Sequence, residues 1–291
     1  EVGLVVGYRE NENLLNIVLE KLPGLSMPSP GIPPLNDTCE RVPSWAGGDE
    51  DSAVSEGRTR AMVKIEDGCN DFCTFCIIPF TRGMPRSTPT HTVIETVQAR
   101  LREGYREIVL TGVHMGKYGQ DHPQRVRAQS DTGEVADLAG VIGAVLSRTD
   151  VPRLRITSVE PTDALMMLPL LTDPRWQGRL APHLHLPLQS GCDATLARMK
   201  RDYNTREYAD TVRRLRAALP EISITTDLIT GFPGETDEEW QETARFVQGM
   251  KFARIHAFPF SRRPGTPAYT MDGQVSDRAR HARTLQVITM S

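Results

Sequence analysis

Short apolar runs alternate with segments of helical periodicity along most of this 291-residue chain. Such alternation predicts βαβ units and therefore a parallel sheet. Six runs are too few for a closed eight-stranded barrel, so we expect an α/β fold of the open six-stranded parallel (βα)6 partial TIM barrel type. Ligand-binding side chains in such sheets stand at the carboxyl ends of the strands. The strands are expected at Ala61–Ile65, Glu107–Thr111, Arg153–Val159, His183–Leu188, Ser223–Thr230 and Arg254–Phe260, and helices at Val93–Glu103, Leu138–Ser147, Arg206–Ala218 and Asp237–Met250.

The residues before the alternating part differ from it in composition. Residues 1–22 hold a short apolar run and an amphipathic segment, which we interpret as the C-terminal tail of an N-terminal α/β domain. Residues 23–57 are rich in proline and contain a flexible polar stretch, which predicts a linker. The core is therefore expected at residues 58–291, with a polar surface insertion at 119–134. Because the chain opens on Glu1, we expect its true beginning to lie upstream.

Charge and hydropathy exclude some classes of protein. The formal net charge is −3, so the chain as a whole does not attract nucleic acid, although local basic clusters occur at Arg82 with Arg86 and at Arg262 with Arg263. No apolar run approaches the roughly 20 residues of a membrane-spanning helix. No secretory leader opens the sequence. These features predict a cytoplasmic protein with no membrane partner.

Three of the five cysteines, Cys69, Cys73 and Cys76, lie within eight residues of one another just after the first expected strand. This clustering is typical of a metal site and makes a poor disulfide framework. Three thiolates can hold three irons of a 4Fe–4S cluster and leave the fourth iron without a protein ligand. A zinc site would need a fourth ligand, for which Cys39 or Cys192 would each close a long loop. An electron-carrying cluster would also need a fourth cysteine.

The segment Lys64–Cys76 resembles the signature of the radical-SAM superfamily, including the aromatic Phe75 before the last cysteine. The resemblance implies that the open iron chelates S-adenosylmethionine (SAM) and that an electron from the cluster releases a 5′-deoxyadenosyl radical. Within the superfamily, further blocks resemble the methylthiotransferases over residues 58–291. These blocks are Ile77–Gly83, Arg86–Pro89, Leu110–His114, Ser158–Pro161, His185–Gly191, Asp227–Thr236 and Phe260–Thr266.

Most of these blocks end at or just beyond an expected strand, where they can meet the cofactor. Gly112 allows close approach of the backbone. Glu160 can accept hydrogen bonds from ribose hydroxyls or the cofactor's ammonium group, and Arg201 can pair with the cofactor's carboxylate. Gly231 and Gly234 permit a tight turn against the adenine. The residues expected to contact SAM are Phe75, Thr111, Gly112, Ser158, Glu160, Gln189, Arg201 and Asp227.

The loop after the second strand, Thr111–Gly119, resembles the branch of the family that modifies N6-threonylcarbamoyladenosine in tRNA, and His183 and His185 fit the same branch. The resemblance implies transfer of a methylthio group to C2 of that adenine, with tRNA as substrate and a reductant such as flavodoxin or ferredoxin as partner. The alternatives are isopentenyladenosine in tRNA, an aspartate of a ribosomal protein, another radical-SAM chemistry, or a non-enzymatic iron–sulfur or zinc protein.

The sequence departs from the family in one respect. The sulfur-donating second 4Fe–4S cluster requires three cysteines of an N-terminal domain, and none of the three is found in residues 1–22. Cys39 matches none of them. In the family a small β-barrel usually follows the core and helps to bind RNA, and we expect the given sequence, which ends at Ser291, to lack it. The given polypeptide is therefore expected to cleave SAM without completing sulfur insertion, and the second cluster is expected only together with the N-terminal domain.

Overall fold

The computed structural model describes residues 59–121 and 137–290. The expected domain tail at 1–22, the linker at 23–57 and most of the insertion at 119–134 lie outside the described residues. No helix in the described part is long and apolar enough to cross a membrane.

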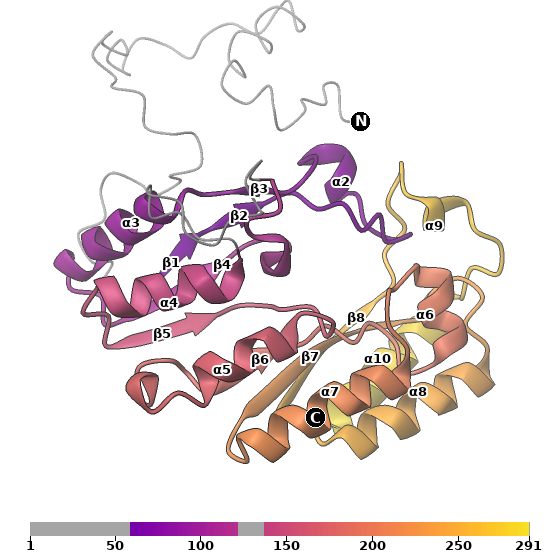
Figure 1. Cartoon of the computed structure of the whole chain (residues 1–291). Coiled ribbons are helices and arrows are strands. Elements are labelled where there is room, and N and C mark those ends of the chain that lie inside the picture. The colour runs from indigo at the N-terminus through magenta and orange to yellow at the C-terminus, as the bar shows by residue number, and fades with distance from the viewer. Residues whose placement is uncertain (1–58, 122–136, 291) are drawn as a thin grey trace, which may run out of the picture.

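The six expected parallel strands are present in the expected order. They form two three-stranded sheets, β1-β4-β5 and β6-β7-β8, in which every pairing is parallel. In Figure 1 the strands follow one another from β1 to β8 in an open arc. The (βα)6 partial barrel is thereby confirmed. The strands are β1 (Arg60–Lys64), β4 (Glu107–Thr111), β5 (Arg153–Ile156), β6 (His183–His185), β7 (Ser223–Thr230) and β8 (Arg254–Pro259).

Two strands are shorter than expected, and they meet at the seam between the sheets. The expected strands at 153–159 and 183–188 end at Ile156 and His185, and β5 and β6 are joined by the isolated bridges Leu154↔Leu180 and Ser158↔His185. Pro182 and Pro187 flank β6. Because proline has no N–H to donate, it does not extend the strand pairing at either end.

A small antiparallel pair was not expected from the sequence. Strand β2 (Glu66–Asp67) pairs with β3 (Arg86–Ser87), and the cysteine segment forms the loop between them. Two-residue strands carry too little periodicity to be recognised in a sequence. This pair fixes both ends of the cysteine loop at the top of the barrel.

Helices follow the strands close to their expected places. The principal helices are α3 (Thr90–Arg102), α4 (Leu138–Arg148), α6 (Asp193–Met199), α7 (Thr205–Ala218), α8 (Asp237–Met250) and α10 (Asp277–Met290). The shorter ones are α2 (Ile78–Thr81), η2 (Met115–Lys117), η3 (Ala164–Met167), α5 (Leu168–Leu171), η4 (Pro174–Trp176) and α9 (Pro267–Thr270).

The start of α8 follows from its sequence. The Thr236 hydroxyl accepts a hydrogen bond from Glu239 N, and the Glu239 carboxylate accepts one from Thr236 N. These two reciprocal hydrogen bonds form a capping box with Thr236 as the N-cap. The helix ends at Met250, where Lys251 takes a left-handed conformation.

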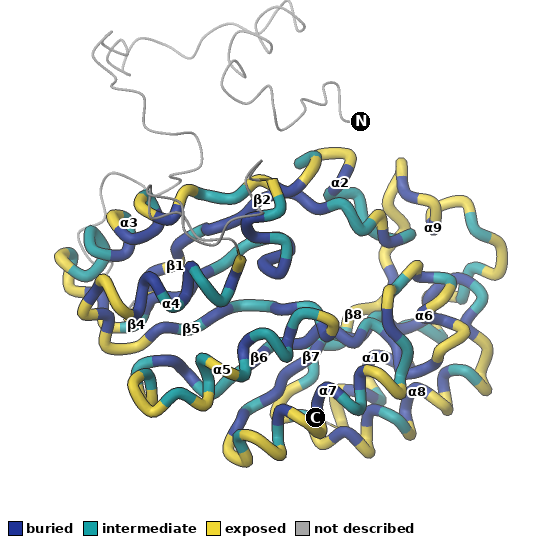
Figure 2. The backbone as a smooth tube through the Cα atoms, in the orientation of Figure 1, coloured by how far each residue is buried: buried dark blue, intermediate teal, exposed yellow. Residues whose placement is uncertain are grey.

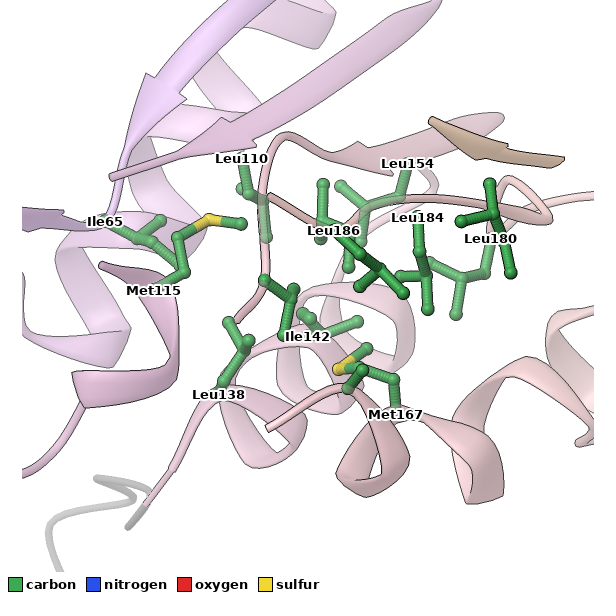
Figure 3. Packing of buried hydrophobic residues seen from close by; sticks show 14 of the residues in the cluster. Ile65, Leu110, Met115, Leu138, Ile142, Leu154, Met167, Leu180, Leu184 and Leu186 are labelled. Carbon is green, nitrogen blue, oxygen red and sulfur yellow. The ribbon is translucent and has the colours of Figure 1, made fainter. Parts of the chain in front are cut away.

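The core lies between the strands and the helices that cover them. Figure 3 shows Leu110, Leu154 and Leu184 from the strands facing Ile142 of α4 and Met167 of η3. Figure 2 shows that β4 and β7 are largely buried, that β8 is more exposed, and that many helical residues are exposed. Burial of this kind stabilises the barrel and leaves the strand ends available for a site.

Candidate functional site

The three clustered cysteines lie on the loop between β2 and α2, and none forms a disulfide. Cys69 and Cys73 are buried, and Cys76 is half-buried. Gly68 begins the loop with φ +89°, and a Cβ there would lie 2.2 Å from the Met84 carbonyl oxygen, so this position requires glycine. The backbone of the loop therefore packs closely against Met84 at this point.

Thr74 connects the cysteine loop to helices α6 and α9, which come much later in the chain. Its N–H donates to Met199 O (3.1 Å) and its hydroxyl donates to Arg198 O (2.8 Å), both at the end of α6. Its carbonyl accepts the N–H of Ala268 in α9 (2.9 Å). The cysteine loop therefore connects the first strand with the last third of the chain.

Arg201 joins the cysteine loop to the end of β5. Its Nη1 donates to Cys73 Sγ at 3.1 Å, and its Nη2 forms an ion pair with Glu160. Its Nε donates to the Tyr203 hydroxyl (3.2 Å), which donates in turn to Pro187 O (2.7 Å). Burial lowers the pKa of Arg201, but Tyr203 and Glu160 outweigh this effect and hold the pKa above its ordinary value. A fixed positive charge thus stands beside a cysteine sulfur.

Asp71, inside the cysteine loop, is held by the 3₁₀ turn η2 that follows β4. The His114 Nε2 lies 2.9 Å and the Lys117 Nζ 3.1 Å from its carboxylate oxygens. Burial raises the pKa of Asp71, but these two partners outweigh it and hold the pKa below its usual range. The ligand atoms of Asp71, His114 and Glu160 lie within 4.8 Å of one another. Lys117 pairs with Asp71 and Arg201 pairs with Glu160, so these carboxylates need no metal cation to balance their charge.

Glu66 is a buried carboxylate that the sequence analysis did not single out. It is 1% exposed, and its Oε2 accepts the N–H of His114 (2.8 Å), while its Oε1 has no hydrogen-bond partner. Burial raises its pKa to about 7. A Cβ at Gly112 would lie 2.9 Å from this carboxylate. Glycine at 112 is therefore required by Glu66, independently of any approach to the cofactor.

Phe75 lies in a small aromatic cluster at the other side of the cysteine loop. Its ring is 6.4 Å from that of Phe232, which lies 5.3 Å from that of Phe260. Phe232 belongs to the turn after β7, where the Glu235 carboxylate accepts the N–H groups of Gly231 (2.8 Å) and Phe232 (3.2 Å). The expected tight turn at Gly231 is thus present and lies beside Phe75.

Of the remaining expected residues, Thr111 ends β4, Ser158 and Gln189 follow β5 and β6, and Asp227 lies inside β7, which continues to Thr230. Ser158 forms a bridge with His185, and Asp227 pairs with His185 Nε2 at 3.2 Å. Thr111 Oγ1 is 3.5 Å from Thr157 Oγ1. Gln189 adopts φ +65°, and its N–H donates to Asp227 O.

These contacts form two groups. Cys73, Glu160 and Arg201 line one pocket, together with Asp71, His114 and Lys117. Asp227, Ser158 and Gln189 are gathered around His185 and β7. The sequence analysis did not select Glu66 or Asp71. Both lie close to the cysteines in the sequence, Glu66 in the acidic pair Glu66-Asp67 and Asp71 between Cys69 and Cys73. Their partners His114 and Lys117 are distant in the sequence.

The donor set fits an iron–sulfur cluster. Burial raises the pKa of Cys69 to about 12 and raises that of Cys73, so metal binding at these thiols would be coupled to release of their protons. Arg201 favours the thiolate of Cys73. Cys192, the other free cysteine among the described residues, lies on a different loop and is the buried N-cap of α6.

Comparisons with known proteins agree with this geometry. The family model of the Radical SAM superfamily matches residues 63–247. The chain is 36% identical over its whole length to the threonylcarbamoyladenosine tRNA methylthiotransferase of Bacillus subtilis, of which it covers 60%. It is 41% identical over 78% of its length to the protein of the same name from Thermotoga maritima (50% covered). It is 38% identical over 79% of its length to the tRNA-2-methylthio-N(6)-dimethylallyladenosine synthase of Staphylococcus haemolyticus (42% covered).

Solved structures share the fold at low sequence identity. Methylornithine synthase has a TM-score of 0.54 at 14% identity, covering 79% of this chain and 61% of that one. A radical S-adenosylmethionine methyltransferase from Kitasatospora setae has a TM-score of 0.56 at 14% identity, covering 72% and 38%. The chain spans about half the length of the curated relatives it matches. With its three-cysteine loop, its partial barrel and a match across most of the core, the chain belongs to the radical SAM superfamily.

Proposed function

We propose that this chain binds a 4Fe–4S cluster through Cys69, Cys73 and Cys76 and cleaves SAM beside it, as the radical-generating core of a tRNA methylthiotransferase. The observation that carries the proposal is Arg201, whose guanidinium contacts Cys73 Sγ and pairs with Glu160 in one pocket. A charged pair that could bind SAM therefore stands beside one of the three sulfurs that would hold the cluster. When bound, the cluster supplies the electron that splits SAM into methionine and a 5′-deoxyadenosyl radical.

The chain's own residues bind and orient the cofactor. Arg201 has more N–H donors than its present partners use, so it can also receive the carboxylate of SAM. Glu160 offers oxygen acceptors for the ammonium or ribose hydroxyl groups. Phe75, beside the turn at Gly231, provides an apolar face for the adenine. We assign Thr111, Gly112, Ser158, Gln189 and Asp227 to the remaining cofactor contacts.

The substrate follows from the relatives and from the loop after β4. Two of the relatives are named for threonylcarbamoyladenosine in tRNA and one for dimethylallyladenosine in tRNA. The Thr111–Gly119 segment carries the first pattern, so we propose N6-threonylcarbamoyladenosine as the modified base. A small reductant of the flavodoxin or ferredoxin class delivers the electron. The second, sulfur-donating cluster is proposed only for a protein that also carries the N-terminal cluster domain.

Deuterium transfer tests this proposal without requiring sulfur insertion. Synthetic anticodon stem-loops carrying either threonylcarbamoyladenosine or isopentenyladenosine, each deuterated at C2, are incubated anaerobically with the iron-loaded chain, SAM and dithionite. We expect deuterium in 5′-deoxyadenosine from the first RNA and little from the second. A preference for the second RNA would move the chain to the other branch, and 5′-deoxyadenosine without deuterium from either would remove tRNA as the substrate.

A further inference from the structure

Two aromatic side chains on the outer side of the cysteine loop are exposed. Phe72 is 39% and Phe80 59% exposed, and their rings lie 5.8 Å apart in an edge-to-face arrangement. Phe72 adopts φ +52°, which is rare for a bulky residue, and it stays exposed while the next residue, Cys73, is buried. Exposed rings gain little from burial in this fold, so stability alone does not account for them.

Cations lie beside this aromatic pair. The Lys200 ammonium lies 5.8 Å from the centre of the Phe72 ring. Arg82, two residues after Phe80, and Arg86 are 40% and 43% exposed, and both pair with Asp67, so two guanidinium groups share one carboxylate. Positive charge is thus concentrated here although the net charge of the chain is negative.

Lys200 links the aromatic pair to the candidate site. Its ammonium lies over the Phe72 ring, and its side chain lines the pocket that also holds Cys73, Glu160 and Arg201. Phe72 is also the residue directly before Cys73. Unpaired nucleobases stack on aromatic rings, and their phosphates attract the neighbouring cations.

We propose that Phe72 and Phe80, with Lys200, form a stacking platform for unpaired RNA nucleotides that flank the base entering the pocket. The exposed rings match the faces of bases, and the excess of cations over carboxylates beside them matches the charge of phosphates, which an apolar protein segment does not carry. The inference rests on the proposed function in that the entering base belongs to RNA. It adds a binding surface outside the cofactor pocket.

RNA affinity of the iron-loaded chain tests the platform. The probe is an anticodon stem-loop with 2-aminopurine in its loop, and the readouts are fluorescence anisotropy and quenching of 2-aminopurine. Phe80→Ala should raise the Kd about tenfold and restore 2-aminopurine fluorescence, and Phe80→Trp should keep both near the wild-type values. Lys200→Ala should reduce the slope of log K against log salt by about 0.7.

The matched control is Leu285→Ala, which removes an apolar side chain of similar exposure (52%) from α10, a helix that lies apart from α2 in Figure 1. Equal RNA affinity of Phe80→Ala and Leu285→Ala would overturn the proposal. So would a fall in melting temperature specific to Phe80→Ala with unchanged RNA affinity, because the ring would then be covered by protein.

Formation of 5′-deoxyadenosine without RNA is measured in parallel. If the wild type forms no 5′-deoxyadenosine, the proposed radical chemistry is contradicted. If the wild type forms it and Phe80→Ala leaves the RNA affinity unchanged, only the platform is contradicted.

Discussion

Arg201 contacts two groups that are far from it in the sequence, Cys73 and Glu160. One planar guanidinium can serve both because its donors point in several fixed directions, and an ammonium group cannot reproduce that geometry. The side chain is 6% exposed, so its charge has little water around it. Its three partners, the sulfur, the carboxylate and the Tyr203 hydroxyl, therefore define its position within the pocket.

Replacing Arg201 by lysine tests this geometry. We expect Arg201→Lys to raise the Kd for SAM about tenfold or more, because the forked contact is lost while the charge remains. Iron content should be unchanged, since the cysteines are intact. Equilibrium dialysis of the iron-loaded protein measures the Kd, with Arg213→Lys, an exposed arginine of α7, as the control. Normal SAM affinity in Arg201→Lys would place the cofactor elsewhere.

The buried carboxyl group of Glu66 should make the free energy of unfolding depend on pH. Its pKa is raised by burial from 4.5 to about 7, so the folded state favours the protonated carboxyl. Its contribution to stability is present at low pH and is lost as the pH rises from about 4.5 through about 7, by about 3 kcal/mol in total. Urea unfolding of the metal-free protein should show this fall, and Glu66→Gln should flatten the profile. Parallel profiles for the two proteins would mean that Glu66 is not responsible.

Residue types and spacing led to the prediction of the three cysteines, Glu160 and Arg201 as site residues, and the structure brings Cys73, Glu160 and Arg201 into contact. They were not sufficient to find Glu66 and Asp71 or their partners. The contacts of Asp71 with His114 and Lys117 form only when β1 and β4 pair side by side, which places the cysteine loop next to η2. Burial, which sets the pKa of Glu66, is likewise a property of the folded barrel.

At the scale of elements, the cysteine loop is held from three directions. The β2–β3 pair fixes its ends, η2 holds Asp71, and Thr74 bonds to α6 and α9. The sequence predicted the strands and helices that build the barrel, because their periodicity extends over several residues. It did not predict β2, β3 or η2, which are too short to show a period. The elements that hold the site are thus the ones least visible in the sequence.

His114→Ala removes one hydrogen-bonded partner of Asp71. A hydrogen bond to a charged group contributes about 1.5–3 kcal/mol, so the cysteine loop should be held less firmly. We expect His114→Ala to lose iron faster than the wild type during anaerobic gel filtration in the presence of a chelator. His281→Ala, which changes an exposed histidine of α10, is the control. Equal rates of iron loss in both variants would show that η2 does not support the loop.

The capping box of α8 permits a prediction that is independent of the site. Thr236→Ala removes the hydroxyl that accepts from Glu239 N and should lower the free energy of unfolding by about 1 kcal/mol. Thr236→Ser keeps the hydroxyl and should stay near the wild type. Denaturant unfolding measures both, and SAM affinity of the loaded protein should be the same in the two variants. An equally large fall in the free energy of unfolding of Thr236→Ser would indicate that the Thr236 methyl group stabilises the protein by packing, and not the hydroxyl by capping.

For the whole molecule, the barrel is made of two sheets with a seam between β5 and β6, and the cysteine loop spans from β2 to α6 and α9. The fold class and strand order were predictable because βαβ units pair in sequence order in such barrels. The position of the seam was not, since it depends on where prolines beside β6 interrupt the pairing.

Iron bound at the cysteine loop should stabilise the whole molecule, because the loop connects its first strand with its last third. A ligand that binds only the folded state raises its stability. We expect the iron-loaded protein to melt at a higher temperature than the chelator-treated protein by differential scanning calorimetry. Cys73→Ala should show no such difference. A wild type that melts at the same temperature with and without iron would contradict this connection.

The central claim is that Cys69, Cys73 and Cys76 hold a cluster that cleaves SAM. The most direct measurement is anaerobic formation of 5′-deoxyadenosine by the reconstituted chain with SAM and dithionite, in parallel with Cys76→Ala. The account predicts product from the wild type, with about four irons per chain, and none from Cys76→Ala. No product from a folded, fully iron-loaded wild type would contradict it, and so would zinc in place of iron in the protein as isolated anaerobically.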